Sequence, residues 1–415
     1  MPVPTAWSPS SAPVSPATPS WSTWGSTGRC ACSPSPVWFP NCAIAAVSAE
    51  PAAVCDDGCV PPSATVSVEQ LREVGLGAGL VALGVTGVEP LIEARSALWE
   101  RRDLGLNGTM QFTYRNPDRS TEPRALLEGA ASLVVGAWPY PGGDHQQAEN
   151  PDDRIEKANG RVARYATRDH YADLREALAR VAAELERAGY RTRIVADDNA
   201  LVDRAAAHRA GIGWFGKNAN LLVPGHGSWV LLGSVVTDAV LDESSPVDDG
   251  CGTCRRCIDA CPTGAIVAPG VVDARRCLAW LVQAEGSIPE EFRVALGDRI
   301  YGCDDCQEVC PPSRRSPEAA LVVDAAGSQV DLLELLASDD EQLLARHGRW
   351  YIARRDPRHL RRNAIVALGN VADPSDTRVR ASLGECALSD DVMLAEHARW
   401  ALDRLDLRSN SGLDR

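Results

Sequence analysis

The stretch CGTCRRCIDACPTGAI, from Cys251 to Ile266, is the most informative part of this sequence. It holds cysteines at positions 251, 254, 257 and 261, and Pro262 follows the last of them. This C-x2-C-x2-C-x3-C-P pattern is typical of bacterial ferredoxins, in which the first three thiolates bind one 4Fe–4S cluster and the fourth binds a second cluster. The pattern predicts electron transfer and requires a second cysteine set elsewhere in the chain.

That second set is C-x2-C-x3-C-P, formed by Cys303, Cys306 and Cys310 and ending at Pro311. It lacks a first cysteine at the usual spacing, and Cys277 upstream is the natural replacement. The expected ligands are Cys251, Cys254, Cys257 and Cys310 for one cluster, and Cys261, Cys277, Cys303 and Cys306 for the other. The alternative is structural zinc, but zinc ribbons usually show two CxxC pairs about 15–20 residues apart.

Composition limits the remaining possibilities. The chain has 415 residues, of which 45% are hydrophobic, so it can bury a large core divided among two or three domains. The net charge of −14 means that the surface as a whole does not attract a polyanion. The uneven placement of the 14 cysteines favours metal ligation in a reducing compartment, the cytoplasm, over secreted disulfides. We find no run of about 18 apolar residues and expect no membrane partner.

Residues 1–65 differ from the rest, because they are rich in Ser, Pro, Ala and Trp and hold few charges. They contain neither a signal peptide pattern nor a twin-arginine pair before an apolar run. We expect either a disordered leader or a start codon assigned too early, with Val66 or Val68 as a plausible true start.

From residue 66 onward, apolar segments alternate with helical patterns, which favours an α/β domain with a mixed or parallel sheet. We expect this α/β domain over 66–245, an inserted ferredoxin-like two-cluster domain over 246–315, and a helical segment over 316–415. The segments RRNAIVALGN and AEHARWALDRL in the last part are spaced like two copies of a HEAT-like helical repeat.

Three motifs of the α/β domain could carry chemistry. VADDN places Asp197 and Asp198 at a strand end, where a carboxyl with a raised pKa can act as a general acid, although an aspartate there could instead cap the next helix. GIGWFGKN, residues 211–218, favours close approach to a phosphate or planar ligand, or else a simple glycine-rich turn. ARYATRDHY, residues 163–171, is either a functional cluster or a solvated helix face.

The helical segment contains a dense basic stretch. Seven arginines and a single acid, Asp356, lie between Arg346 and Arg362, together with His347 and His359. On an acidic chain, this stretch is where nucleic-acid phosphates would be neutralised. The alternative is an ordinary solvated basic face.

Taken in order, these motifs closely resemble the epoxyqueuosine reductase family over roughly residues 67–405. The resemblance rests on GTMQFTYRN, ARYATRDHY, VADDN, GIGWFGKN, GSWVLLGSVVTD, the first cysteine run, IYGCDDCQEVCP and RRNAIVALGN. GIGWFGKN and IYGCDDCQEVCP, in that order, are highly specific.

The resemblance implies that the chain reduces epoxyqueuosine to queuosine at the tRNA wobble position, with cobalamin held between the α/β and ferredoxin-like domains and fed by two 4Fe–4S clusters. It implies a proton-donating aspartate at Asp197, with Asp198 adjacent, although this chain departs from the family in the residues that follow. It implies cobalamin contacts from Lys217, Asn218, Leu221, Val223 and Asp304. The expected partners are the anticodon stem-loop and an external electron donor, and we expect a monomer.

Two other functions remain open at this point. A reductive dehalogenase would share the cobalamin and the clusters, but such enzymes usually carry a twin-arginine signal and do not need clustered arginines in a helical tail. A ferredoxin-type electron-transfer protein would bind no cobalamin at all. The visible spectrum of the purified protein would separate this last possibility from the two enzymes.

Overall fold

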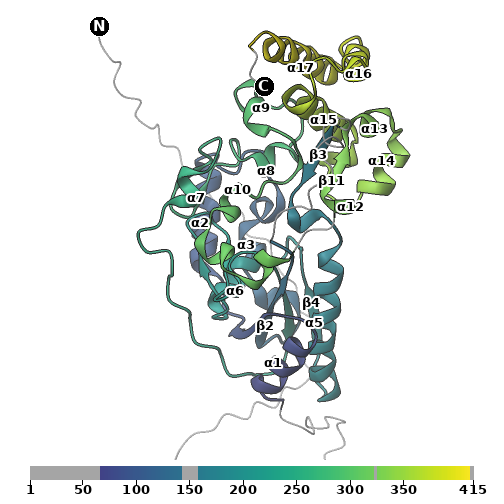
Figure 1. Ribbon diagram of the computed structural model, residues 1–415. Coiled ribbons are helices and arrows are strands. Elements are labelled where there is room, and N and C mark those ends of the chain that lie inside the picture. Colours follow the sequence, from purple (N-terminus) through teal and green to yellow (C-terminus); the bar gives the residue numbers. More distant parts are fainter. Residues whose placement is uncertain (1–65, 143–157, 322–324, 412–415) are drawn as a thin grey trace, which may run out of the picture. The chain divides into compact units, whose positions relative to one another are not determined.

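The computed structural model describes residues 66–142, 158–321 and 325–411, and Figure 1 shows the course of the chain. The predicted leader over 1–65 lies outside the described residues. The described residues belong to one compact unit, Val60–Arg415. Within them, no helix is both long enough and apolar enough to cross a membrane.

A four-stranded sheet organises the α/β domain, in the order β1 (Ala82–Gly87), β2 (Ser132–Pro139), β7 (Val230–Thr237) and β4 (Thr192–Val195). Every pairing in this sheet is antiparallel. The expectation of a mixed or parallel sheet was therefore wrong here. The cause is burial, because β2 and β7 are covered on both faces, and such strands have the near-continuous apolar sequence that is typical of parallel sheets.

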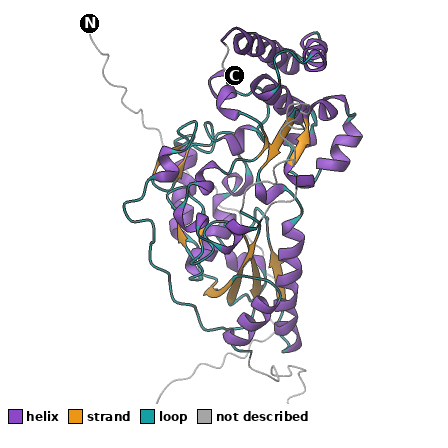
Figure 2. Cartoon of the chain, in the orientation of Figure 1, coloured by secondary structure: helices purple, strands orange, loops and turns teal. Residues whose placement is uncertain are grey.

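Helices cover the two faces of this sheet. α1 (Val68–Gly77) and α5 (His170–Arg187) pack on one face, and Figure 2 shows the long helix α5 beside the strands. α6 (Asp203–Arg209) packs on the other face. Alternate β2 residues serve the two cores: Val134 faces the α1 and α5 side, whereas Leu133 and Val135 face α6.

The helices begin where the sequence supplies caps. Ser67 and Gln70 form a capping box at the start of α1, and the Asp169 side chain accepts a hydrogen bond from the backbone of Ala172 at the start of α5. α2 (Ile92–Asp103) packs mainly on α3 (Pro117–Ser120) and the short helix η1 (Phe112–Arg115). α2 is therefore not a crossover helix that connects parallel strands. Its position agrees with the antiparallel pairing of β1 and β2.

Short elements make up the cysteine-rich segment. They are α7 (Arg256–Asp259), β8 (Ile266–Ala268), β9 (Val271–Val272), α8 (Leu278–Leu281), α9 (Glu290–Leu296), β10 (Arg299–Tyr301), α10 (Asp305–Glu308) and α11 (Pro311–Arg314). β10 pairs in parallel with β3 (Asn159–Val162), and β11 (Gln329–Asp331) pairs antiparallel with β3. A mixed sheet thus exists, but it joins the cysteine-rich segment to the flanking parts of the chain.

Helices dominate the C-terminal part. They are α12 (Ala325–Ser328), α13 (Leu332–Ala337), α14 (Asp340–His347), α15 (Arg358–Val371), α16 (Thr377–Ala387) and α17 (Val392–Ser411). α15 packs on α13 and α17, and it also contacts the cysteine-rich segment. The Asn363 side chain donates hydrogen bonds to the carbonyls of Val282 (2.7 Å) and Ile300 (3.0 Å), so the helical part is anchored beside the second cysteine motif.

The remaining described elements are short. They are β5 (Trp214–Phe215), β6 (Leu221–Leu222), η2 (Pro123–Leu126), η3 (Arg164–Ala166), η4 (Pro317–Ala320) and η5 (Ala353–Arg355). β5 and β6 pair as a small hairpin around the GIGWFGKN turn.

Candidate active site

The charge interactions among the motif cysteines show which thiols are neighbours. Burial raises the pKa of the Cys257 thiol, and the next contributions come from Cys310 and Cys251. Burial also raises the pKa of the Cys303 thiol to about 12, with Cys277 among the neighbours that raise it further. Burial raises the pKa of the Cys277 thiol, and the charge of Cys261 raises it further. Cys257 thus has Cys310 and Cys251 as neighbours, and Cys277 has Cys303 and Cys261.

Within the described ranges, no group of three or more His, Cys, Asp or Glu residues is gathered around a point where one metal ion would sit. A cubane takes one thiolate on each iron, so its ligands need not converge on a single point. All eight motif cysteines are free thiols, and Cys257 and Cys310 are buried.

The GIGWFGKN turn connects the α/β domain to both cysteine motifs. The Lys217 ammonium donates a 2.6 Å hydrogen bond to the carbonyl of Gly252, in the first motif. The buried Asn218 amide donates a longer bond, 3.4 Å, to the carbonyl of Cys306, in the second. Trp214 packs in one apolar cluster with Cys251 and Cys310.

The glycines of this turn are explained by contacts within the protein. Gly211 has a φ of +69°, and a Cβ there would lie 2.0 Å from the carbonyl oxygen of Ser245. A Cβ at Gly213 would lie 2.4 Å from the carbonyl oxygen of Leu222. The side chains of Leu221 and Val223 are buried in the core beneath α6, so only their backbone could meet a cofactor.

The second cysteine motif is held by a buried ion pair. The Arg164 guanidinium lies 3.2 Å from the Asp304 carboxylate and 2.5 Å from that of Glu308, and Arg164 and Asp304 are both buried. The ARYATRDHY segment is therefore no solvated helix face. Asp304, predicted to contact the cofactor, already has its carboxylate engaged by Arg164.

A group of polar and aromatic side chains lies beside this ion pair. The Tyr140 hydroxyl lies 3.3 Å from the Gln307 side chain, and the Tyr140 ring lies 5.8 Å from that of His170. His170 is buried, and neither of its ring nitrogens has a hydrogen-bond partner among the described residues. Burial lowers the pKa of His170 to about 4, so the ring is neutral near pH 7.

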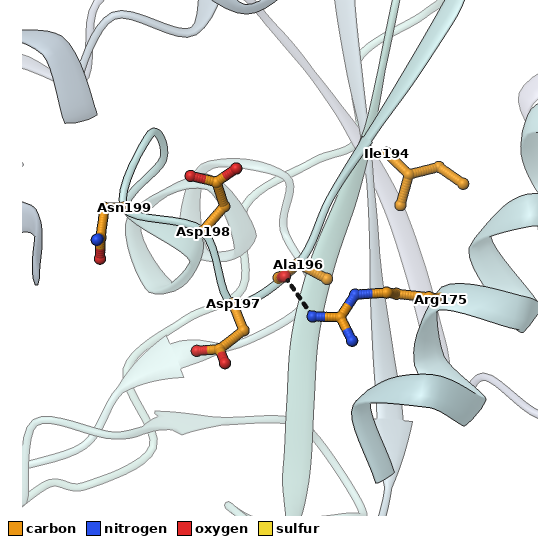
Figure 3. Close-up of a pocket in the computed structure, with 6 residues that line it drawn as sticks. All are labelled: Arg175, Ile194, Ala196, Asp197, Asp198 and Asn199. Atoms are coloured by element: carbon orange, nitrogen blue, oxygen red, sulfur yellow. Dashed lines mark hydrogen bonds between the residues drawn. The ribbon is translucent and has the colours of Figure 1, made fainter. Parts of the chain in front are cut away.

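A recess of about 480 Å³ opens at the end of β4. It is lined by Arg175, Ile194, Ala196, Asp197, Asp198 and Asn199. Figure 3 shows the Asp197 and Asp198 carboxylates pointing away from one another, with Arg175 reaching over from α5. The Arg175 guanidinium donates a 3.1 Å hydrogen bond to the carbonyl of Ala196, so it braces the loop through its backbone.

Asp197 has the features of a proton donor. Its φ is +55°, a left-handed conformation that is costly for a residue with a Cβ and that recurs at functional sites. Asp197 is exposed to solvent, yet desolvation by the surrounding protein raises the pKa of its carboxyl group. The positive charge of Arg175 lowers this pKa, and the negative charge of Asp198 raises it. A raised pKa keeps a carboxyl protonated at higher pH.

Neither aspartate caps α6. The N-cap residue of α6 is Val202, which makes no side-chain capping bond, so the helix-capping alternative is wrong. The Asp198 carboxylate instead accepts a 2.9 Å hydrogen bond from the backbone of Ala200, in a turn of its own. This bond occupies Asp198 and leaves Asp197 as the less engaged acid of the two.

Two further ionisable residues interact with Asp197: Tyr171, which belongs to the ARYATRDHY segment, and Asp203, which no sequence motif singled out. One Asp203 carboxylate oxygen is buried without a hydrogen-bond partner among the described residues, and burial together with the Asp197 charge raises the pKa of Asp203 well above its usual value. The pKa of Tyr171 is raised by burial and then by Asp197 and Asp203. Asp203 did not stand out in the sequence, because acidic residues are common in the first turn of a helix.

The basic stretch of the tail is smaller than the count of arginines indicates. Arg346 pairs with Glu334, Arg361 with Asp340, and Arg358 with Asp356 and Asp391. Arg362 is fully buried and donates to backbone carbonyls, including that of Leu281. Most of these acids come from outside the stretch, so sequence counting could not see them. The other three arginines are exposed, and Arg354 pairs with Glu285, Arg349 donates to the carbonyls of Ala166 and Thr167, and Arg355 donates to that of Gly348.

Comparison with known families gives two matches within the chain. Residues 250–313 match the family model for a 4Fe-4S double cluster binding domain. Residues 120–198 match the model described as epoxyqueuosine reductase QueG, DUF1730, a range that ends on the Asp197–Asp198 pair. The chain thus carries a domain for two 4Fe–4S clusters, as the cysteine spacing predicts.

Characterised relatives extend the likeness over most of the chain. The epoxyqueuosine reductase of Xanthomonas campestris pv. campestris is 36% identical over 76% of this chain and 90% of its own length. That of Vibrio cholerae serotype O1 is 34% identical over 78% of this chain and 89% of its own.

Solved structures agree with these relatives. An epoxyqueuosine reductase bound to an epoxyqueuosine-modified tRNA-Tyr stem loop has a TM-score of 0.73 at 31% identity, covering 81% of this chain and 89% of that one. A Bacillus subtilis structure, with its catalytic aspartate loop swung out of the active site, has a TM-score of 0.72 at 30% identity, covering 81% and 90%. With relatives above 30% identity over nearly their full length, the chain belongs to the epoxyqueuosine reductase family.

Proposed function

We propose that this chain reduces epoxyqueuosine to queuosine at the wobble position of tRNA. Both carbon–oxygen bonds of the epoxide break, the oxygen leaves as water, and a carbon–carbon double bond forms. This change consumes two electrons and two protons. The chain must therefore bring an electron path and a proton donor to one place, and the functions of its relatives and its own site support this reaction.

The electron path is the double-cluster domain. We propose Cys251, Cys254, Cys257 and Cys310 as ligands of one cluster, and Cys261, Cys277, Cys303 and Cys306 as ligands of the other. The thiol neighbours of Cys257 and Cys277 support this division. Helices α7 and α10, which carry Cys257 and Cys306, pack on one another, and this proximity supports electron transfer between the two clusters. An external donor supplies the electrons.

Cobalamin is the second cofactor in this proposal, and when bound its cobalt supplies the centre for reduction of a carbon–oxygen bond. Buried polar groups lie where the α/β domain meets the second cysteine motif, among them Asn218 and the unpartnered ring of His170, and they fit a large polar cofactor. Lys217, Asn218 and Asp304 would hold it, with backbone contributions from Leu221 and Val223.

The proton donor in this proposal is Asp197. Its raised pKa and its place on a recess support the role, and Asp198 is the less suitable acid because a turn hydrogen bond engages it. Burial is the main cause of the raised pKa of Asp197, Arg175 opposes it, and the charges of Asp198 and Asp169 add to it.

The remaining assignments follow from the same activity. We propose that 66–245 is the catalytic α/β domain, that 246–315 is the two-cluster domain, and that 316–415 is a HEAT-like helical domain that contacts tRNA. We also propose that the protein works as a monomer in the cytoplasm, where thiols stay reduced.

The observation that carries this proposal is the link from the GIGWFGKN turn of the α/β domain to both cysteine motifs. The test is an anaerobic assay with reconstituted protein, a chemical reductant and tRNA that contains epoxyqueuosine. We expect queuosine to form only when both iron and corrinoid are bound. A protein that carries both cofactors and leaves the epoxide intact would overturn the proposal, and absence of corrinoid after reconstitution would favour a simple electron carrier.

A further inference from the structure

Three aromatic rings from distant parts of the chain meet at one place. Phe112 comes from η1, Trp280 from α8, and Tyr351 from the segment before η5. The Phe112 and Tyr351 ring centroids are 4.9 Å apart, Trp280 and Tyr351 stack at 6.1 Å, and Phe112 meets the Trp280 edge at 6.0 Å. We call these three rings the aromatic platform.

The platform is open on one side. Tyr351 is 40% exposed and Phe112 is partly exposed, whereas Trp280 is 5% exposed and supports the other two from within. The Tyr351 backbone N–H donates a 2.8 Å hydrogen bond to the Tyr301 hydroxyl, which fixes the segment that carries the exposed ring. A ring held in this way meets a ligand with little further loss of freedom.

The surroundings of the platform are basic. Arg354 has a 77% exposed side chain, and its ion pair with the half-exposed Glu285 spans 3.1 Å. Arg355 is exposed, and its guanidinium donates a hydrogen bond to the carbonyl of Gly348. An exposed aromatic ring beside exposed guanidinium groups is the arrangement that binds an unpaired nucleotide, because the base stacks and its phosphate pairs.

The backbone around the platform is strained. Five non-glycine residues in the described ranges have a left-handed φ, and three of them are Phe112, Arg354 and Arg355. A fourth is Asp197 on the recess. Such conformations persist where the fold needs a side chain aimed in a particular direction.

The platform also adjoins the second cysteine motif. The Tyr301 hydroxyl, which accepts the hydrogen bond from the Tyr351 backbone, belongs to the residue two positions before Cys303. Trp280 follows Cys277, a proposed cluster ligand, by three residues.

From these contacts we infer that the aromatic platform stacks an unpaired base of the RNA loop, with Arg354 and Arg355 on the adjoining phosphates. The inference deepens the proposed function, since it assigns a surface that holds the RNA loop. It does not depend on turnover, because stacking needs neither cluster chemistry nor the epoxide.

The test uses an unmodified anticodon stem-loop RNA with 2-aminopurine in the loop, titrated with the holoprotein. Stacking on Tyr351 quenches the fluorescence. We expect Tyr351→Ala to lose the quenching and to weaken binding about 5- to 100-fold. Tyr351→Phe, which keeps the ring, should retain the quenching and bind within about 2-fold of the parent chain.

Trp99→Leu is the matched control. Trp99 is another exposed ring beside an arginine, with Arg102 at 5.0 Å, but its indole N–H donates to the acidic Asp118. We expect this variant to bind RNA like the parent chain. Arg354→Gln should lower the dependence of log affinity on log salt by about one phosphate contact, whereas Tyr351→Ala should leave that slope unchanged.

Several results would overturn the inference. The parent chain alone can give the first of these results: it binds the RNA, but the 2-aminopurine fluorescence is not quenched at any loop position. Another is equal binding and quenching in Tyr351→Ala that keeps both clusters. If Tyr351→Ala does not fold, Phe112→Leu provides the same comparison. Tyr351-dependent RNA binding by a chain that fails to reduce epoxyqueuosine would overturn the proposed function and leave the platform standing.

Discussion

The second cysteine motif and the Asp197 loop differ in how firmly the rest of the protein holds them. The motif is fixed by two contacts from distant parts of the chain, Arg164 on Asp304 and Asn218 on the carbonyl of Cys306, and by a nearby ion pair between Arg299 and Asp305. The Asp197 loop has one long-range brace, from Arg175 to the carbonyl of Ala196, and its three residues 197–199 are exposed.

This difference suits the two tasks in the proposed reaction. Electron transfer needs clusters at fixed separation, so the cysteine motif is embedded in buried ion pairs. A proton donor must reach a substrate that enters and leaves, so its loop is open and weakly braced. The Bacillus subtilis relative whose catalytic aspartate loop is swung out of the active site shows that such a loop can adopt a second position in that protein.

Loss of a cluster ligand should have the largest effect. Cys306→Ser removes a thiolate from the firmly held motif, and we expect iron to fall from about eight to about four atoms per chain, with no measurable turnover. Iron analysis and the queuosine assay measure both quantities. Cys386→Ser, in a tail helix away from both motifs, is the control and should retain iron and activity. Full iron in Cys306→Ser would contradict the proposed ligand set.

Replacement of Asp197 should lower the turnover without lowering the stability of the protein. Asp197→Asn keeps the shape of the side chain but cannot donate a proton, so turnover should fall by about 10²- to 10⁴-fold while iron content and thermal midpoint stay unchanged. Asp198→Asn is the matched variant and should retain most of the activity. The opposite ranking of the two variants would assign the proton to Asp198.

The two regions should also differ in stability. Arg164→Met leaves the buried Asp304 carboxylate without its charged partner, and we expect a loss of about 3–5 kcal/mol in the free energy of unfolding. Arg255→Met removes an exposed pair with Asp259 in the first cysteine motif, and the loss should be within about 1 kcal/mol. Urea titration of the anaerobic holoprotein measures both, and equal losses would mean that the second motif is not specially braced.

The sequence predicted the electron side better than the proton side. Cysteine spacing is local, so both cluster sets could be written down from the positions of Cys251 to Cys310. The roles of Asp203, Tyr301 and Tyr351 depend on contacts between segments far apart in the chain. The antiparallel sheet was missed because burial on both faces erases the alternation that marks such strands.

The smallest expected effect is on pH dependence. A proton donor is active while protonated, so turnover should fall as pH rises through the raised pKa of Asp197. The Asp198 charge contributes to that raised value, so Asp198→Asn should lower the pKa of Asp197. The falling limb should then move to lower pH, by less than about 1 unit, in single-turnover rates. A limb that stays in place would show that Asp198 does not influence the donor.

The central claim is that this chain reduces epoxyqueuosine in tRNA with electrons from its two clusters and a proton from Asp197. The most direct measurement is nucleoside analysis of tRNA from a strain that lacks its own epoxyqueuosine reductase and expresses this chain or its Asp197→Asn variant. We expect queuosine with the parent chain and accumulated epoxyqueuosine with the variant, at equal iron content. Epoxyqueuosine that persists with a parent chain carrying its cofactors, or queuosine restored by the variant, would contradict the account.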